Sequence, residues 1–127
     1  MIQVGIIGGA GYTAGELIRL LMFHKEAEIN FVYSTSNAGN QISKVHQDLE
    51  GSLNLKFTGS INPNVDVLFL CLGHGNSIKF LEVNICNSIR VVAYAVCFVL
   101  PGSNFCFGVS FQDSKEFSEY FMVAIFI

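Results

Sequence analysis

The sequence predicts an α/β fold with a doubly wound parallel sheet, and three observations support this. Apolar runs alternate with amphipathic stretches over residues 1–92, a glycine-rich turn follows the first apolar run, and the run at residues 65–72 also ends in glycines. Such alternation is typical of βαβ units, in which a helix connects two parallel strands. We therefore expect strands near residues 2–7, 29–33, 66–72 and 89–92, and helices at 14–23 and 77–83.

Composition limits the class of protein. A chain of 127 residues with 51% hydrophobic and 13% charged residues is suited to one globular domain and not to a disordered chain. The net charge of −3, without a basic block, argues against nucleic acid as a partner. No apolar run reaches the roughly 18 residues needed to cross a bilayer, and we see no signal peptide. We therefore expect a cytoplasmic protein with no membrane partner.

The cysteine and histidine residues give little indication of a metal site. The four cysteines form no C-x-x-C pair and lie in or beside apolar segments, so we expect reduced, buried thiols instead of disulfides or metal ligands. With three histidines and no clustered acids, we predict no metal. His46 lies two residues before Asp48, which raises the alternative of a catalytic pair. A structural hydrogen-bonding role for His46 is the favoured interpretation.

The first strand leads into a glycine turn that fits a dinucleotide fingerprint. Gly9-x-Gly11-x-x-Ala14 matches G-x-G-x-x-G/A, and Gly8-x-x-Gly11-x-x-Ala14 matches the wider-spaced variant. One glycine makes the tight turn, one admits the pyrophosphate, and a small third residue lets helix and strand pack closely. N–H groups at the helix start then face the phosphates. A Rossmann-like domain is predicted, with a turn that binds nothing as the alternative. The predicted cofactor-binding residues here are Gly8, Gly9, Ala10, Gly11, Tyr12, Thr13 and Ala14.

The end of the second strand bears on cofactor choice. A NAD-selective fold usually carries an acidic residue there for the ribose 2′-hydroxyl. This chain has Ser34, Thr35, Ser36 and Asn37 instead, and no arginine. Hydroxyl and amide groups can accept a 2′-phosphate without charge repulsion, so we predict NADP (NADPH), bound by Ser34, Ser36 and Asn37. An ordinary polar loop is the alternative.

The strand near residues 66–72 ends at Gly73-His74-Gly75. Because ligands of open parallel sheets lie at the carboxyl ends of the strands, this loop should face the same crevice as the glycine turn.

Several of these segments resemble one enzyme family. The similarity is to N-acetyl-gamma-glutamyl-phosphate reductases of the semialdehyde-dehydrogenase superfamily. It is carried by four segments, at residues 8–21, 34–39, 45–49 and 66–75. The resemblance is good to about residue 92, while residues 93–127 diverge. It implies that His74 and Gly75 lie near the cofactor, with Gly73 where the family usually has proline. It also implies a short strand near the end of an excursion at residues 38–60.

The family resemblance implies an activity in arginine biosynthesis. The implied reaction is NADPH-dependent reduction of N-acetyl-glutamyl phosphate to N-acetylglutamate semialdehyde, through a cysteine nucleophile, in a cytoplasmic enzyme that is a homo-oligomer at full length. This chain has Ala93, Cys97 and Val99 where the family has two aspartates and an arginine. The nucleophile motif would follow Ile127, so we expect residues 1–127 to be the NAD(P)-binding domain, with no catalytic residue, no catalytic or dimerisation domain, and no activity alone. Two alternatives remain: an aspartate-semialdehyde dehydrogenase-type fragment, or a non-catalytic Rossmann domain that acts only by association through its sheet edge.

Overall fold

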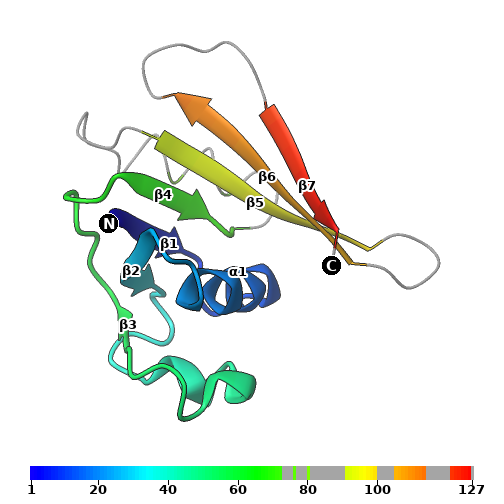
Figure 1. Ribbon diagram of the computed structural model, residues 1–127. Helices are drawn as coiled ribbons and strands as arrows, with labels where there is room; N and C mark the ends of the chain where they lie inside the picture. The colour runs from blue at the N-terminus through cyan, green and yellow to red at the C-terminus, as the bar shows by residue number, and fades with distance from the viewer. Residues whose placement is uncertain (73–75, 77–79, 81–90, 100–104, 114–120, 127) are drawn as a thin grey trace.

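The computed structural model describes residues 1–72, Asn76, Phe80, 91–99, 105–113 and 121–126. In this part of the chain helix α1 and a seven-stranded sheet form most of the fold, with two short 3-10 helices beside them (Figure 1). The elements are β1 (Ile2–Ile7), α1 (Tyr12–Met22), β2 (Ala27–Tyr33), η1 (Ile42–Lys44), η2 (Gln47–Leu49), β3 (Phe57–Thr58), β4 (Val67–Leu70), β5 (Val91–Val99), β6 (Phe105–Asp113) and β7 (Phe121–Phe126).

The sheet has the order β3-β2-β1-β4-β5-β6-β7. The pairs from β3 to β5 are all parallel, which confirms the predicted α/β class and the four expected strands. β3, inside the excursion, is the short strand that the family resemblance implied. The chain runs from β1 outward to β2 and β3, and then returns to the other side of β1 with β4. The strand order therefore reverses beside β1, where open α/β sheets bind their ligands.

The last part of the chain, beyond the four strands that the sequence predicts, adds antiparallel strands to the sheet. β5 pairs with β6, and β6 with β7, in antiparallel orientation. Figure 1 shows these three strands extending as one long ribbon beyond the parallel part. A parallel pair needs a crossover of about a dozen residues or more. Only residues 100–104 separate β5 from β6, and only residues 114–120 separate β6 from β7, so short connections enforce antiparallel pairing.

One face of the sheet is covered by α1. Ala14, Leu17 and Ile18 of this helix join Val4 and Ile6 of β1 in a buried cluster. Their spacing of three and four residues places them on one side of the helix, as an amphipathic helix requires. Further members come from β2, β4, β3 and the excursion: Val32, Phe69, Phe57, Ile42 and Leu49.

The opposite face of the sheet is also buried. Alternate residues of a strand point to opposite sides, so the residues between those of the first cluster lie on this face. Ile7, Phe31, Leu68 and Leu70 form a second cluster there with Val65. Burial on both faces explains why the central strands read as continuous apolar runs.

Phe80 packs against this second cluster, and its ring meets that of Tyr33 edge-on, with 5.7 Å between the ring centroids. The helix expected at 77–83 otherwise lies outside the described residues. None of the helices within the described ranges is long and apolar enough to cross a membrane.

Candidate functional site

The glycine turn lies at the carboxyl end of β1, at the point where the strand order reverses. Its first half, Gly8 and Gly9, is fixed by the protein itself. Both N–H groups donate to the carbonyl oxygen of Tyr33 at the end of β2, at 3.1 and 2.9 Å. Gly8 has φ +77°, a conformation that residues with a Cβ rarely adopt. A Cβ on Gly9 would lie 2.1 Å from Cγ1 of Val32. The fold alone therefore requires both glycines.

Gly11 is different, because the protein leaves space beside it. Its φ of −75° suits any residue, and it is exposed. The nearest atoms to a Cβ there would be the carbonyl oxygens of Gly8 and Cys71, at 3.5 and 3.8 Å, which is ordinary van der Waals contact. The fold therefore does not explain this glycine, whereas close approach of a ligand to the backbone does.

The start of α1 offers backbone donors beside Gly11. Gly11 is the N-cap and has no side chain to cap the helix, and no acidic residue stands in the first turn. The N–H groups of Ala10, Thr13 and Ala14 make no hydrogen bond within the described part of the chain. Unsatisfied N–H groups and the positive end of the helix dipole favour an anionic group at this place.

The loop after β2 begins beside the turn, because Tyr33 accepts the hydrogen bonds from Gly8 and Gly9. Ser34 is 5% exposed, and its N–H donates to the carbonyl oxygen of Thr58 at 3.0 Å. Ser36 is exposed, and its hydroxyl oxygen accepts a 3.2 Å hydrogen bond from the Asn37 amide. Of the three predicted 2′-phosphate ligands, the hydroxyl of Ser34 is thus the least accessible.

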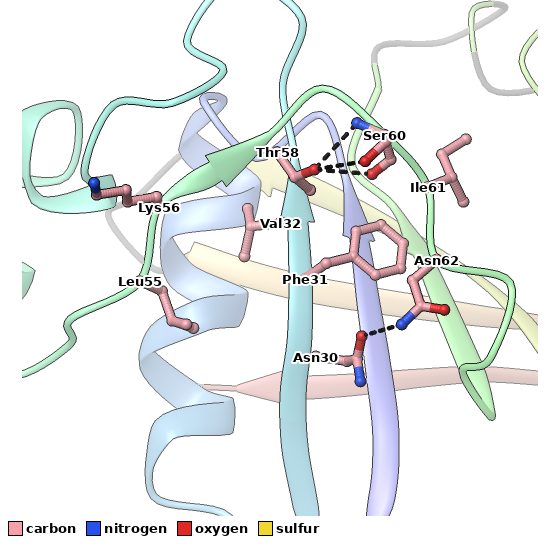
Figure 2. Close-up of a pocket in the computed structure, with 9 residues that line it drawn as sticks. All are labelled: Asn30, Phe31, Val32, Leu55, Lys56, Thr58, Ser60, Ile61 and Asn62. Atoms are coloured by element: carbon pink, nitrogen blue, oxygen red, sulfur yellow. Dashed lines mark hydrogen bonds between the residues drawn. The ribbon is translucent and has the colours of Figure 1, made fainter.

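A pocket of about 320 Å³ that sequence reasoning did not anticipate lies along β2 and β3 (Figure 2). Its polar groups engage one another: the Asn62 amide donates to Oδ1 of Asn30 at 2.8 Å, and Thr58 Oγ1 accepts from the N–H of Ser60 at 3.1 Å. No residue of the glycine turn or of the loop after β2 lines it. The lining residues are Asn30, Phe31, Val32, Leu55, Lys56, Thr58, Ser60, Ile61 and Asn62.

Cys71 joins the carboxyl end of β4 to the turn. Its N–H donates to the carbonyl oxygen of Ile7 at 2.9 Å, and its own carbonyl oxygen would lie 2.9 Å from a Cβ on Gly8. The residue is partly buried against the core, and burial raises the pKa of its thiol to about 12. A thiol that stays protonated at neutral pH is a poor nucleophile, in keeping with the expectation of reduced, buried cysteines. The predicted site residues His74 and Gly75 lie outside the described residues.

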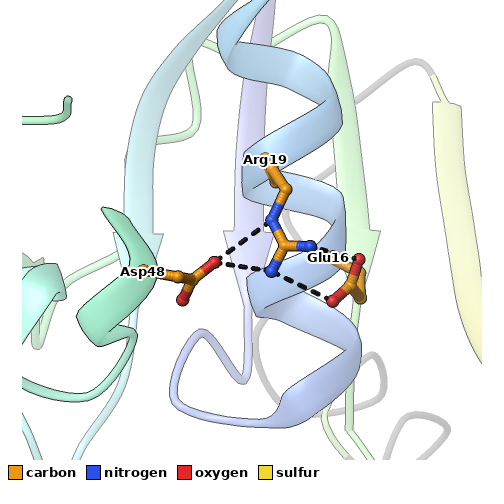
Figure 3. Close-up of polar contacts among 3 residues, drawn as sticks. All are labelled: Glu16, Arg19 and Asp48. Carbon is orange, nitrogen blue, oxygen red and sulfur yellow. Dashed lines mark hydrogen bonds and ion pairs between the residues drawn. The ribbon is translucent and has the colours of Figure 1, made fainter. Parts of the chain in front are cut away.

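His46 and Asp48 do not form a catalytic pair. His46 is 9% exposed, and its Nε2 lies 2.7 Å from the carbonyl oxygen of Gly9, so the structural interpretation is confirmed. Asp48 instead pairs with Arg19 of α1, whose Nη2 and Nε lie 2.5 and 3.1 Å from Oδ2 (Figure 3). Arg19 also contacts Glu16, with Nη2 3.2 Å from Oε1. Sequence reasoning missed the contact of His46 with Gly9, because 37 residues separate them.

Comparison with known proteins identifies the family. A family model described as "Semialdehyde dehydrogenase, NAD binding domain" matches residues 3–98. The chain belongs to this semialdehyde dehydrogenase NAD-binding domain family. The matched span contains β1, the glycine turn, α1 and the parallel strands β2 to β4, so the predicted dinucleotide-binding fold is confirmed at the level of the family.

Curated relatives of this family domain are named N-acetyl-gamma-glutamyl-phosphate reductase. The protein of Flavobacterium johnsoniae is 64% identical over 84 residues, which cover 66% of this chain and 26% of the relative. That of Christiangramia forsetii is 61% identical over 84 residues, with the same two shares. That of Bacteroides fragilis is 48% identical over 113 residues, covering 86% of this chain and 35% of the relative. The chain therefore spans about a quarter to a third of the length of these relatives.

Proposed function

We propose that this chain is the NADP-binding part of an N-acetyl-gamma-glutamyl-phosphate reductase, an oxidoreductase of arginine biosynthesis. Relatives that carry this name are 61 to 64% identical to the chain over 84 residues. The observation that carries the proposal is the open space beside Gly11 at the point where the strand order reverses, which the fold itself does not require. We extend the proposal to a cytoplasmic location and to a homo-oligomer for the full-length enzyme, both on family resemblance.

The residues of the glycine turn fit a dinucleotide by their backbone chemistry. The pyrophosphate would face the N–H groups of Ala10 and Thr13, which have no partner within the described residues. Gly11 would let the pyrophosphate approach the backbone closely. When bound, NADPH supplies a hydride, and the role of this chain is to hold and orient it.

The preference for NADPH over NADH rests on the loop after β2. Ser36 and Asn37 present a hydroxyl and an amide beside the turn, and residues 34–40 contain no acidic side chain. An acid in this loop would accept hydrogen bonds from the ribose hydroxyls of NADH and repel the 2′-phosphate of NADPH. We expect Ser36 and Asn37 to contribute more to the preference than Ser34, because the side chain of Ser34 is buried.

Calorimetric titration of the 127-residue chain with NADPH and with NADH tests both parts of the proposal. We expect saturable binding of both dinucleotides, with NADPH bound about tenfold more tightly, which corresponds to about 1.4 kcal/mol. Equal or tighter binding of NADH would contradict the preference. Absence of binding by either dinucleotide would favour the alternative of a Rossmann domain that acts only by association.

Ser36→Asp should remove the preference, lowering the affinity for NADPH about tenfold or more while leaving NADH binding equal or tighter. Ser52→Asp is the matched control, because Ser52 is exposed and follows η2, outside the loop after β2. It adds the same charge and should leave the ratio of the two affinities unchanged. Should both aspartate variants change the ratio equally, the 2′-phosphate would not lie at Ser36.

A further inference from the structure

His46 reaches the glycine turn from the excursion, a segment that carries no dinucleotide fingerprint. It lies at the N-cap of η2, and its ring is buried with Nε2 2.7 Å from the carbonyl oxygen of Gly9. A carbonyl oxygen can only accept a hydrogen bond, so Nε2 must carry the proton and donate it. The contact therefore fixes both the tautomer of His46 and the direction of the Gly9 carbonyl.

The helix makes room for this ring. A Cβ on Gly15 of α1 would lie 2.6 Å from Nδ1 and 2.8 Å from Cε1 of His46. On the other side, the ring of Phe57 lies with its centroid 6.4 Å from that of His46. Gly15 thus provides a space the size of one missing side chain, and His46 fills it. The ring of His46 therefore packs against Gly15 of α1 and lies near Phe57 of β3.

The direction of the Gly9 carbonyl decides what the next N–H can do. The peptide between Gly9 and Ala10 is planar and trans, so its C=O and N–H point in opposite directions. With the carbonyl held toward the buried ring of His46, the N–H of Ala10 points away from it. That N–H makes no hydrogen bond within the described residues.

The same contact bears on the first turn of α1. In a helix that began earlier, the carbonyl of Gly9 would accept the N–H of Thr13, four residues on. Here His46 occupies this carbonyl, and the Thr13 N–H makes no hydrogen bond to any described residue. Both backbone donors are thus available to a ligand: that of Ala10 points away from the carbonyl that His46 holds, and that of Thr13 stands in the first turn of α1, where the helix supplies no acceptor.

We infer that His46 is a positioning residue for the pyrophosphate of the dinucleotide. It orients the Gly9–Ala10 peptide before the cofactor arrives, so that binding does not have to order the turn. This inference rests on the proposed function, since it assumes that the turn binds a dinucleotide. It assigns a binding role to the excursion, which the fingerprint does not include.

The test compares three variants by the Kd for NADPH. His46→Phe keeps a ring of similar size but removes the donor, and we expect the Kd to rise about tenfold. His46→Gln keeps a donor at the position of Nε2, and we expect it to restore the Kd to within about threefold. His24→Gln is the matched control, because His24 is exposed beyond the other end of α1, and it should leave the Kd unchanged.

A ligand without a pyrophosphate separates positioning from general destabilisation. Adenosine 2′-phosphate lacks the group that Ala10 and Thr13 would bind, so His46→Phe should weaken NADPH binding and leave the binding of this nucleotide unchanged. Loss of both in equal measure would indicate a merely structural role and would overturn the inference.

Nitrogen NMR of the imidazoles in the unmodified chain gives a readout that does not depend on any variant folding. We expect His46 to be the Nε2–H tautomer, and an Nδ1–H tautomer would overturn the inference. If the unmodified chain fails to bind NADPH, the proposed function fails and the inference with it. If the unmodified chain binds and His46→Phe binds equally well, only the inference fails.

Discussion

The two halves of the glycine turn face different surroundings. Gly8 and Gly9 are pressed against β2 and the end of β4, where an added Cβ would lie 2.9 Å from the carbonyl oxygen of Cys71 or 2.1 Å from Val32. Gly11 faces space in which the nearest atom to a Cβ would be 3.5 Å away. A single fingerprint thus combines two requirements. The first two glycines serve the fold, and the third is explained by a ligand.

The largest effect should come from Gly9→Ala in the first half. The new Cβ would overlap Cγ1 of Val32, a stiff β-branched side chain, and approach the Phe57 ring at 3.1 Å. We expect the free energy of unfolding to fall by about 2 to 3 kcal/mol, in urea denaturation followed by circular dichroism. Gly11→Ala is the matched control and should change this free energy by less than about 0.5 kcal/mol. Equal losses in both variants would erase the difference between the halves.

The pH dependence of stability sharpens the account of the first half, because Cys71 packs the end of β4 against Gly8. Burial raises the pKa of the Cys71 thiol from 9.0 to about 12. A group whose pKa is raised in the folded state contributes stability below its unfolded pKa and loses it as pH rises toward the folded pKa. The chain should therefore lose about 1 kcal/mol between pH 8 and pH 10 relative to Cys71→Ala.

This comparison cancels the titration of lysines and tyrosines, which both proteins share. Parallel pH curves for the chain and for Cys71→Ala would show that water reaches the thiol, and that the end of β4 does not pack as the first half of the turn requires.

The smallest effect should come from the ion pair that attaches the excursion to α1. Arg19 and Asp48 are about half exposed, at 48% and 50% for their side chains, so solvent screens their attraction. Asp48→Asn should lower the free energy of unfolding by about 0.5 kcal/mol at low salt, and the difference should vanish in about 1 M NaCl. Glu50→Gln, at an exposed carboxylate for which no ion pair is found among the described residues, is the control. A loss that persists at high salt would mean that Asp48 acts through packing or hydrogen bonding.

The parallel part of the fold could be predicted because each strand ends in a recognisable signal. The glycine turn after β1 and the polar loop after β2 marked where these strands end, and the apolar runs indicated a parallel sheet. The continuation of β5 beyond residue 92 and its antiparallel pairing with β6 were not predicted, although two apolar runs separated only by residues 100–104 are a hairpin signal. The length of the connection decides the orientation here, because residues 100–104 are too few for the crossover of a parallel pair.

The position of the glycine turn in the candidate site could be predicted from the sequence, but the residues that pack against the turn could not. The fingerprint located residues 8–14, but it could not show that Gly8 and Gly9 meet the fold's own needs. The position of His46 in a polar segment indicates that its side chain makes a hydrogen bond, but does not show which residue is the partner. The contact of His46 with Gly9 depends on how the excursion folds back over α1. Gly15 leaves the room for this contact, and its missing side chain has no local signature.

The most direct test of the open half is Gly11→Val, measured by NADPH titration and thermal unfolding together. A Cβ at this exposed position has room in the free protein, but the valine side chain would occupy the space that the pyrophosphate needs. The account predicts that the unmodified chain binds NADPH, whereas Gly11→Val shows no saturable binding and unfolds within a few degrees of the unmodified chain. Equal binding of NADPH by both proteins would contradict it, because the glycine would then serve neither the fold nor the ligand.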